Sequence, residues 1–261
     1  MSDLSKNLLK KDLLKDFDLT EDEFIGGKIT VFQPAKGYRA GIDAVLLAAT
    51  VVANPGERIL DLGSGVGTAG LCLMGREPEA KVTGLELQAV LFQIAQKNKE
   101  TNQLEDRWSL VNGDLLQLPD DLPLGSFDQI ICNPPFMPKG TSHGSPDPIK
   151  LLANHEGEAT LRDWLLASLK LVKPKGAVTI IHRADRLDEI LSVFREKKAG
   201  AIEVCPLWPY DGQPAKRVIV RARRGISKPM IITAGHKLHE TDGSYTDIID
   251  GALRRGQALP L

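Results

Sequence analysis

The central part of the chain alternates between short apolar runs and longer amphipathic segments. The apolar runs are rich in Ile, Val and Leu and are bounded by turn residues, which predicts buried strands at 58–63, 81–86, 108–114, 127–132 and 176–182. The segments between them carry apolar residues at helical spacing, at 66–75, 87–102, 161–172 and 184–198. Two further strand-like runs, 201–208 and 216–223, follow with no helix between them.

This order of elements predicts an α/β fold. Strand–helix–strand repeats form a doubly wound, mostly parallel sheet, here with seven strands. Only a loop joins the last two runs, so we expect an antiparallel strand at the C-terminal edge of the sheet. Upstream, FIGGKITVFQP indicates a β-hairpin with its turn at Gly26-Gly27, followed by a buried helix within 41–53.

Composition narrows the functional classes. Apolar residues make up 42% of the 261 residues, and the formal net charge of −1 means that only a local patch could bind a polyanion. Cys72, Cys132 and Cys205 are far apart in apolar segments, so we expect buried thiols and no zinc or disulfide framework. No secretory segment or membrane-spanning run is evident. We therefore expect a cytoplasmic protein with no metal and no membrane partner.

A glycine-rich loop, ILDLGSGVGTAG, follows the first strand of the alternation. Ligands bind beyond the carboxyl ends of such strands, and Gly63 and Gly65 let the backbone approach them closely. Asp61 disfavours a pyrophosphate here and favours a positively charged cofactor. Glu86 ends the second strand, where an acid can accept from ribose hydroxyls, and Asp114 ends the third, beside an adenine amino group. These acids together favour S-adenosylmethionine (SAM).

The same loop formally matches the dinucleotide pattern GxGxxG. A single match of this kind is weak evidence. An NAD-dependent oxidoreductase is therefore a distant alternative, which Asp61 disfavours.

The fourth strand stops abruptly at Asn133-Pro134-Pro135-Phe136. Two prolines cannot continue a strand, because each lacks an N–H and has a fixed φ. The Asn133 amide oxygen and the Pro134 carbonyl can accept hydrogen bonds from an exocyclic amino group and aim its lone pair at a methyl donor. Phe136 can stack on a planar base. We expect this motif to carry the catalysis.

These motifs together resemble those of a known family. The chain resembles the class I, Rossmann-like SAM-dependent methyltransferases with an Asn-Pro-Pro-aromatic motif, and most of all the small-domain group that contains bacterial tRNA(Val) adenine-N6 methyltransferases. The resemblance covers roughly residues 26–224 and rests on GYRAGIDAVLLAA, LDLGSGVG, GLELQ, NGDL and NPPF. It implies an N-terminal extension with a hairpin at 1–40, a Rossmann-like methyltransferase domain at 41–225 and a C-terminal tail at 226–261.

The resemblance also assigns roles to residues. It implies that Asp61, Gly63 and Gly65 hold the methionine part of SAM, that Glu86 holds the ribose and that Asp114 holds the adenine. Arg39 and Asp43, within YRAGIDA, would pack over the cofactor. Residues 133–136 would hold the target amino group.

The stretch 137–160 departs from the tRNA enzymes, and we expect it to form a loop over the pocket. It contains His143 and His155, which we interpret as ordinary loop or substrate-contact histidines. Their spacing with Glu156 fits no familiar metal site.

The main functional hypothesis is an N-methyltransferase acting on an exocyclic amino group in RNA, with adenine N6 in tRNA favoured. Arg217, Arg221 and Arg223 share one face of a predicted strand and are candidate nucleic-acid contacts. Alternatives are a protein glutamine N-methyltransferase, an rRNA guanine-N2 methyltransferase and a non-catalytic cofactor- or RNA-binding module. The intact NPPF motif argues against the last of these.

Overall fold

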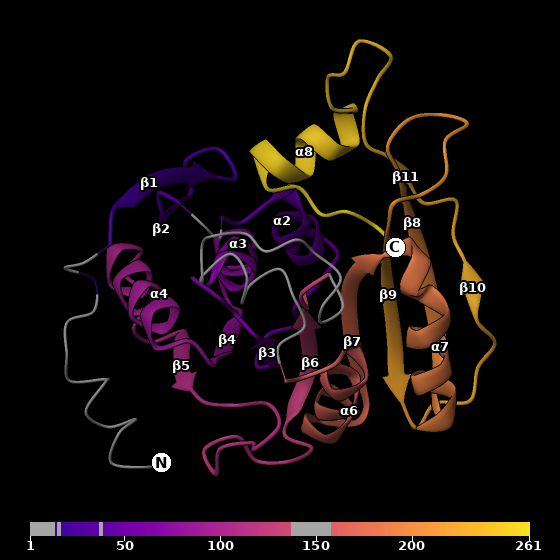
Figure 1. The fold of residues 1–261 in the computed structure, drawn as a ribbon, viewed down its shortest axis with the longest axis horizontal. Coiled ribbons are helices and arrows are strands. Elements are labelled where there is room, and N and C mark those ends of the chain that lie inside the picture. Colours follow the sequence, from indigo (N-terminus) through magenta and orange to yellow (C-terminus); the bar gives the residue numbers. More distant parts are fainter. Residues whose placement is uncertain (1–13, 15–16, 37–38, 137–157) are drawn as a thin grey trace.

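The computed structural model describes residues 14, 17–36, 39–136 and 158–261 (Figure 1). Its main sheet has the strand order β10-β8-β9-β7-β6-β3-β4-β5, and the short strand β11 also pairs with β8. The strands are β3 (Arg58–Leu62), β4 (Lys81–Glu86), β5 (Trp108–Asn112), β6 (Phe127–Cys132), β7 (Val172–Arg183), β8 (Ala199–Trp208), β9 (Arg217–Arg224), β10 (Ile231–Ile232) and β11 (His236–Lys237). The predicted doubly wound, mostly parallel α/β fold is confirmed, but the sheet of the described residues has nine strands where seven were predicted.

Strand β9 corrects one detail of the prediction. It is antiparallel, as expected, but it lies between β7 and β8 rather than at the edge of the sheet. The cause is the path of the chain. Helix α7 (Leu187–Glu196) carries the chain from β7 to β8 and leaves room for one strand between them. The chain then turns back from β8 through a loop, and β9 fills that space.

Helices cover both faces of the sheet and make two separate apolar cores. On one face lie α2 (Ile42–Ala49), α3 (Thr68–Arg76) and α4 (Ala89–Thr101); on the other lie α6 (Leu161–Leu171) and α7, which the short 3₁₀ turn η2 (Ala184–Arg186) precedes. Neighbouring strand residues alternate between the cores, so Ile131 packs in the first and Ile130 in the second. All three cysteines are buried and free, as predicted.

The N-terminal hairpin is confirmed, with β1 (Leu19–Phe24) and β2 (Ile29–Pro34) paired around a turn that contains Gly26 and Gly27. Both glycines have positive φ, which other residues rarely adopt. Two asparagines at the end of α4 join β2 to the main domain, and Asn102 accepts from the Thr30 N–H at 2.9 Å and donates to the Thr30 carbonyl at 2.7 Å. The fully buried Asn98 of α4 accepts from the Phe32 N–H at 2.7 Å and donates to the Phe32 carbonyl at 2.9 Å and to the Val66 carbonyl at 2.9 Å.

The C-terminal segment, whose elements the sequence pattern left unassigned, adds to the first core. Helix α8 (Asp247–Arg255) packs against α2, and it buries Ile249 and Ala252. Leu259 is also buried, and its N–H donates to the Ala49 carbonyl at 2.8 Å. Among the described residues, no helix is long and apolar enough to cross a membrane.

Candidate active site

A pocket of about 370 Å³ lies beyond the carboxyl ends of strands β3 to β6. Its walls are mostly apolar, and two of its leucines are unusually open, since Leu87 is 62% and Leu116 is 43% exposed. Exposed leucines beside a hollow favour a flat apolar ligand that would cover them. The lining residues are Gly63, Gly65, Leu85, Glu86, Leu87, Gln88, Leu91, Gly113, Asp114, Leu115, Leu116, Asn133, Pro135, Glu158, Ala159 and Trp164.

The glycine loop makes one end of this pocket, and Trp164 packs directly against it. Gly63 has φ of 71°, and a Cβ placed there would come within 2.1 Å of the Trp164 ring. A capping box between Thr160 and Asp163 fixes where α6 begins, and this places Trp164 in the first turn of the helix. Trp164 was not among the predicted site residues, because its contact with Gly63 depends on packing across the sheet.

Glu86 ties the end of β4 to the glycine loop. Its carboxylate accepts from the Gly65 N–H at 2.8 Å and from the Gln88 N–H at 2.7 Å. The side chain is buried, and burial raises the pKa of this carboxyl although these backbone N–H groups act to lower it. Glu86 therefore lines the pocket and also shapes the loop at its end.

Asp114 lies on the opposite wall, in the loop after β5. Its carboxylate accepts from the Leu116 N–H at 2.8 Å, which forms a tight turn. The turn presents Leu115 and Leu116 at the pocket. The structure thus brings together Gly63, Gly65, Glu86 and Asp114, four of the predicted cofactor residues.

Asp61 lies near the end of β3, behind the glycine loop. It is 3% exposed, it is not among the lining residues, and its carboxylate accepts from the Gly70 N–H of α3 at 3.1 Å. Burial raises its pKa to about 7; the Gly70 hydrogen bond opposes this rise, and the nearby Glu86 adds to it. Its visible role is to anchor the start of α3 behind the glycine loop. A direct contact with the cofactor stays a prediction.

Asn133 faces the pocket from the end of β6. Its side-chain oxygen is buried and has no hydrogen-bond partner among the residues that the structure describes. An unpaired buried amide oxygen is costly, by about 1–3 kcal/mol. An N–H group of a ligand would remove that cost, so the arrangement fits the predicted capture of an amino group.

The rest of the NPPF motif is supported by His182, which the sequence analysis did not single out. Its ring lies edge-to-face with the Phe136 ring at 5.3 Å, and its Nε2 is 3.4 Å from the Pro135 carbonyl oxygen. Burial lowers the pKa of His182 to about 4, against the effect of Pro135, and Arg186 and Arg217 lower it further. The imidazole is therefore neutral at physiological pH.

Arg39 and Asp43 are not among the described lining residues of the pocket, and their predicted packing over the cofactor stays a prediction. Arg39 pairs with Asp22 of the hairpin at 3.0 Å and donates to Thr20 at 2.7 Å. Asp43, at the start of α2, accepts from the Arg217 guanidinium at 3.3 Å.

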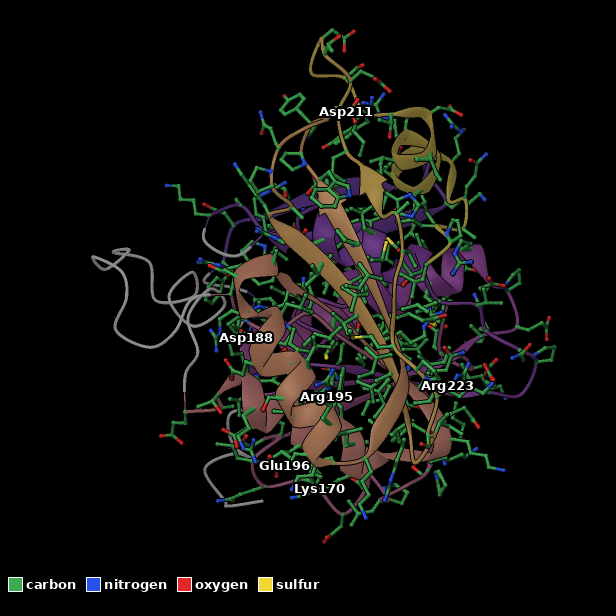
Figure 2. All side chains as sticks on the ribbon, turned by 90° about the vertical axis from the view of Figure 1, so that its right-hand side faces the viewer. Lys170, Asp188, Arg195, Glu196, Asp211 and Arg223 are labelled. Atoms are coloured by element: carbon green, nitrogen blue, oxygen red, sulfur yellow. The ribbon has the colours of Figure 1, made fainter. Side chains whose placement is uncertain are left out.

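The three β9 arginines share one face of the strand, but their partners differ. The Arg217 guanidinium lies over the Phe136 ring, 4.4 Å from its centroid. Arg221 is largely buried and donates to the Thr50 carbonyl at 2.5 Å, and burial lowers its pKa. Arg223 donates to the Lys175 carbonyl at 3.2 Å, at the far end of the strand from the loop that carries Asp211 (Figure 2). These contacts do not favour one common phosphate-binding role, which stays a prediction.

No metal centre is evident among the residues that the structure describes. None of their His, Cys, Asp and Glu side chains form a group of three or more that could hold an ion. His143 and His155, and most of the predicted loop at 137–160, lie outside the described residues.

Comparison with known proteins agrees with this geometry. The family described as "methyltransferase small domain" matches residues 39–145. A curated tRNA1(Val) (adenine(37)-N6)-methyltransferase from Aeromonas hydrophila is 30% identical over 211 residues, which are 80% of this chain and 86% of that protein. A protein of the same name from Porphyromonas gingivalis is 31% identical over 175 residues, 65% of this chain and 68% of that protein.

Solved structures show the same fold. A crystal structure described as a predicted O-methyltransferase from Agrobacterium tumefaciens superposes with a TM-score of 0.69, at 25% identity, and covers 84% of this chain and 99% of its own. M. jannaschii TYW2 in complex with AdoMet has the same fold, with a TM-score of 0.55 at 16% identity over 78% of this chain and 85% of its own.

Fold, pocket and relatives together define a SAM-dependent methyltransferase. Within this class, the chain belongs to the family that the curated tRNA1(Val) (adenine(37)-N6)-methyltransferases represent.

The cofactor fits the residues present. SAM supplies an electrophilic methyl group on a sulfonium. The leucine walls suit its flat adenine ring, and the Glu86 and Asp114 carboxylates are acceptors for its hydroxyl and amino groups. Gly63 and Gly65 also line the pocket and would contact the remaining, methionine part through their backbone.

Replacement of Glu86 by glutamine is expected to weaken SAM binding about tenfold, because it removes a charged acceptor and loosens the Gly65 contact. Calorimetric titration measures this affinity. Glu100→Gln, on the exposed face of α4, is the matched control and should bind SAM as the wild type does. Unchanged affinity in Glu86→Gln would show that this carboxylate does not hold the cofactor.

Proposed function

We propose that the protein transfers the methyl group of SAM to the N6 amino group of an adenine in tRNA. The observation that carries the proposal is the buried, unpaired amide oxygen of Asn133 at the pocket. This oxygen is an acceptor that lacks a donor, on a residue that lines the pocket.

The chemistry follows from the weakness of the nucleophile. The lone pair of an exocyclic amino nitrogen is delocalised into its ring. Hydrogen bonds from its two N–H groups to the Asn133 oxygen and the Pro134 carbonyl favour a pyramidal nitrogen with an exposed lone pair. The oxygen positions are fixed in advance by the stiff double proline, so little reorganisation is needed during reaction.

This arrangement requires no strong base. An amino group can lose its proton after the methyl group has arrived, whereas a hydroxyl group must be deprotonated to become a good nucleophile. Among the described residues, the imidazole that contacts the motif is His182, which packs behind it against Phe136 and Pro135. The pocket carboxylates of Glu86 and Asp114 are already bound to backbone N–H groups. These features favour nitrogen over oxygen as the methylated atom.

RNA is favoured as the substrate by two observations. Phe136 follows the acceptors directly and offers a ring for stacking on a base, a contact of about 1–3 kcal/mol. The relatives named above, which match most of this chain, are named for adenine N6 in tRNA.

The test is methyl transfer from labelled SAM to unmodified tRNA, to rRNA and to a protein fraction, assayed in parallel. Nucleoside digestion should yield N6-methyladenosine from the tRNA alone, and Asn133→Ala should form it about 10²–10³ times more slowly under the same conditions. Label in protein glutamine, or in rRNA guanine, would overturn the proposed substrate.

A further inference from the structure

A layered cluster of side chains lies behind the NPPF motif, and the proposed methyl-transfer steps do not involve it. The Arg217 guanidinium lies over the Phe136 ring, 4.4 Å from its centroid. The His182 ring meets the same ring at an angle of 82°, with centroids 5.3 Å apart. Phe136 is therefore held from two directions by residues of two adjacent strands, β7 and β9.

Arg217 is itself held in place. Its Nε lies 3.3 Å from the Asp43 carboxylate at the start of α2, and both side chains are more than half buried. Asp43, Arg217 and Phe136 thus form a continuous stack from a helix, through a strand, to the catalytic motif. Paired to an acid and covered by an aromatic ring, this guanidinium is poorly placed to bind a phosphate as well.

We propose that Arg217 is a positioning residue, which with Asp43 and His182 fixes the orientation of the Phe136 ring so that the ring can receive the target base. This inference rests on the proposed function for the identity of the base. It departs from the role that strand periodicity suggested, in which Arg217 would contact the RNA backbone.

The two roles predict different results. A phosphate contact contributes counterion release, so its loss lowers RNA affinity and flattens the salt dependence by about 0.7–0.9 log units for each tenfold change in salt. A positioning contact acts on the ring that meets the base in the reactive complex. Its loss lowers the rate of methyl transfer and leaves the salt dependence unchanged.

The experiment compares Arg217→Gln, Arg217→Lys and the wild type in single-turnover methylation of tRNA and in tRNA binding across a salt series. We expect Arg217→Gln to lower the rate about tenfold, with tRNA affinity within about twofold of the wild type and an unchanged salt slope. Arg217→Lys keeps the charge but not the flat guanidinium, so its rate should lie between the two. Arg254→Gln, an exposed arginine on α8 with a similar ion pair, is the control and should behave as the wild type does.

A second measurement needs no substrate. The ring currents of Phe136 act on the His182 imidazole, whose NMR signals are assigned by their loss in His182→Asn. Arg217→Gln should shift these signals, and Arg254→Gln should not. A normal rate with unshifted signals, or a weaker tRNA affinity with a flatter salt slope, would overturn the inference. If the wild type methylates no tRNA, the proposed function fails, and the His182 signals alone decide the role of Arg217.

Discussion

Replacement of Asn133 by alanine is expected to slow methyl transfer by a factor of about 10²–10³ and to leave SAM affinity nearly unchanged. The side-chain oxygen is a fixed acceptor at the reacting nitrogen, and the loss of one preorganised polar contact of this kind costs about 2.7–4 kcal/mol of transition-state stabilisation. Alanine also removes a buried, unpaired oxygen, so the folded protein should not lose stability for that reason. The measurement is the single-turnover rate at saturating SAM and tRNA.

The control for this variant is Asn54→Ala. Asn54 pairs with Glu57, at the opposite end of β3 from the glycine loop, and its loss should leave the rate unchanged. If Asn133→Ala reacts at nearly the wild-type rate, the amide does not act on the substrate. If Asn133→Ala instead loses SAM affinity and keeps a normal rate, Asn133 binds the cofactor. Its assignment to the substrate would then be wrong.

The sequence was sufficient to predict the elements of the hairpin and of the alternating strand–helix region, because they depend on local patterns, but it left the elements after β9 unassigned. The run KVTGLE predicted β4 with the bounds that the structure has, and the glycine pair at 26 and 27 predicted the hairpin turn. The interior position of β9 was not predictable in this way. It depends on how far α7 displaces the chain across the sheet, and no local pattern records that distance.

The candidate active site likewise has some features that follow from local sequence patterns and others that depend on long-range packing. Residues at strand ends were brought together as expected, because parallel strands place their carboxyl ends along one edge. Trp164 and His182 were missed, because they reach the site by packing from α6 and β7. For Arg221, periodicity gave the correct face of β9, but that face is covered by the end of α2, where the Thr50 carbonyl accepts its hydrogen bond. Which face of a strand is exposed is decided by elements far away in sequence.

The buried carboxyl of Asp61 leads to a second large effect, on stability as a function of pH. Its pKa in the folded protein is about 7, compared with an ordinary value of 3.8, and burial is the main cause. Because the pKa is raised in the folded protein, the protonated Asp61 carboxyl stabilises the folded state. This stabilisation is complete at pH values below 3.8, and it is lost as the pH rises through 7. Between pH 5 and pH 8 the loss amounts to about 2–3 kcal/mol.

The buried His182 acts in the opposite direction over much of the same range. Its pKa is lowered from 6.5 to about 4, so its contribution to stability is present above pH 6.5 and is lost as pH falls towards 4. The free energy of unfolding of the wild-type protein can therefore change little between about pH 4 and pH 6.5, because the two effects oppose each other. Only a comparison of variants separates the two groups.

Asp61→Asn is the variant that isolates the carboxyl, because asparagine keeps an oxygen for the Gly70 N–H and carries no charge. Relative to the wild type, its free energy of unfolding should rise by about 2–3 kcal/mol between pH 5 and pH 8, measured by urea denaturation without SAM. Asp185→Asn, at an exposed carboxylate paired with Arg183, is the control and should show no such rise over this range, because the pKa of Asp185 is lowered rather than raised. A constant difference between Asp61→Asn and the wild type would mean that Asp61 is ionised throughout this range. In that case another group behind the glycine loop must stabilise the charge of the Asp61 carboxylate. The hydrogen bond from Gly70 would then not fully explain the role of Asp61.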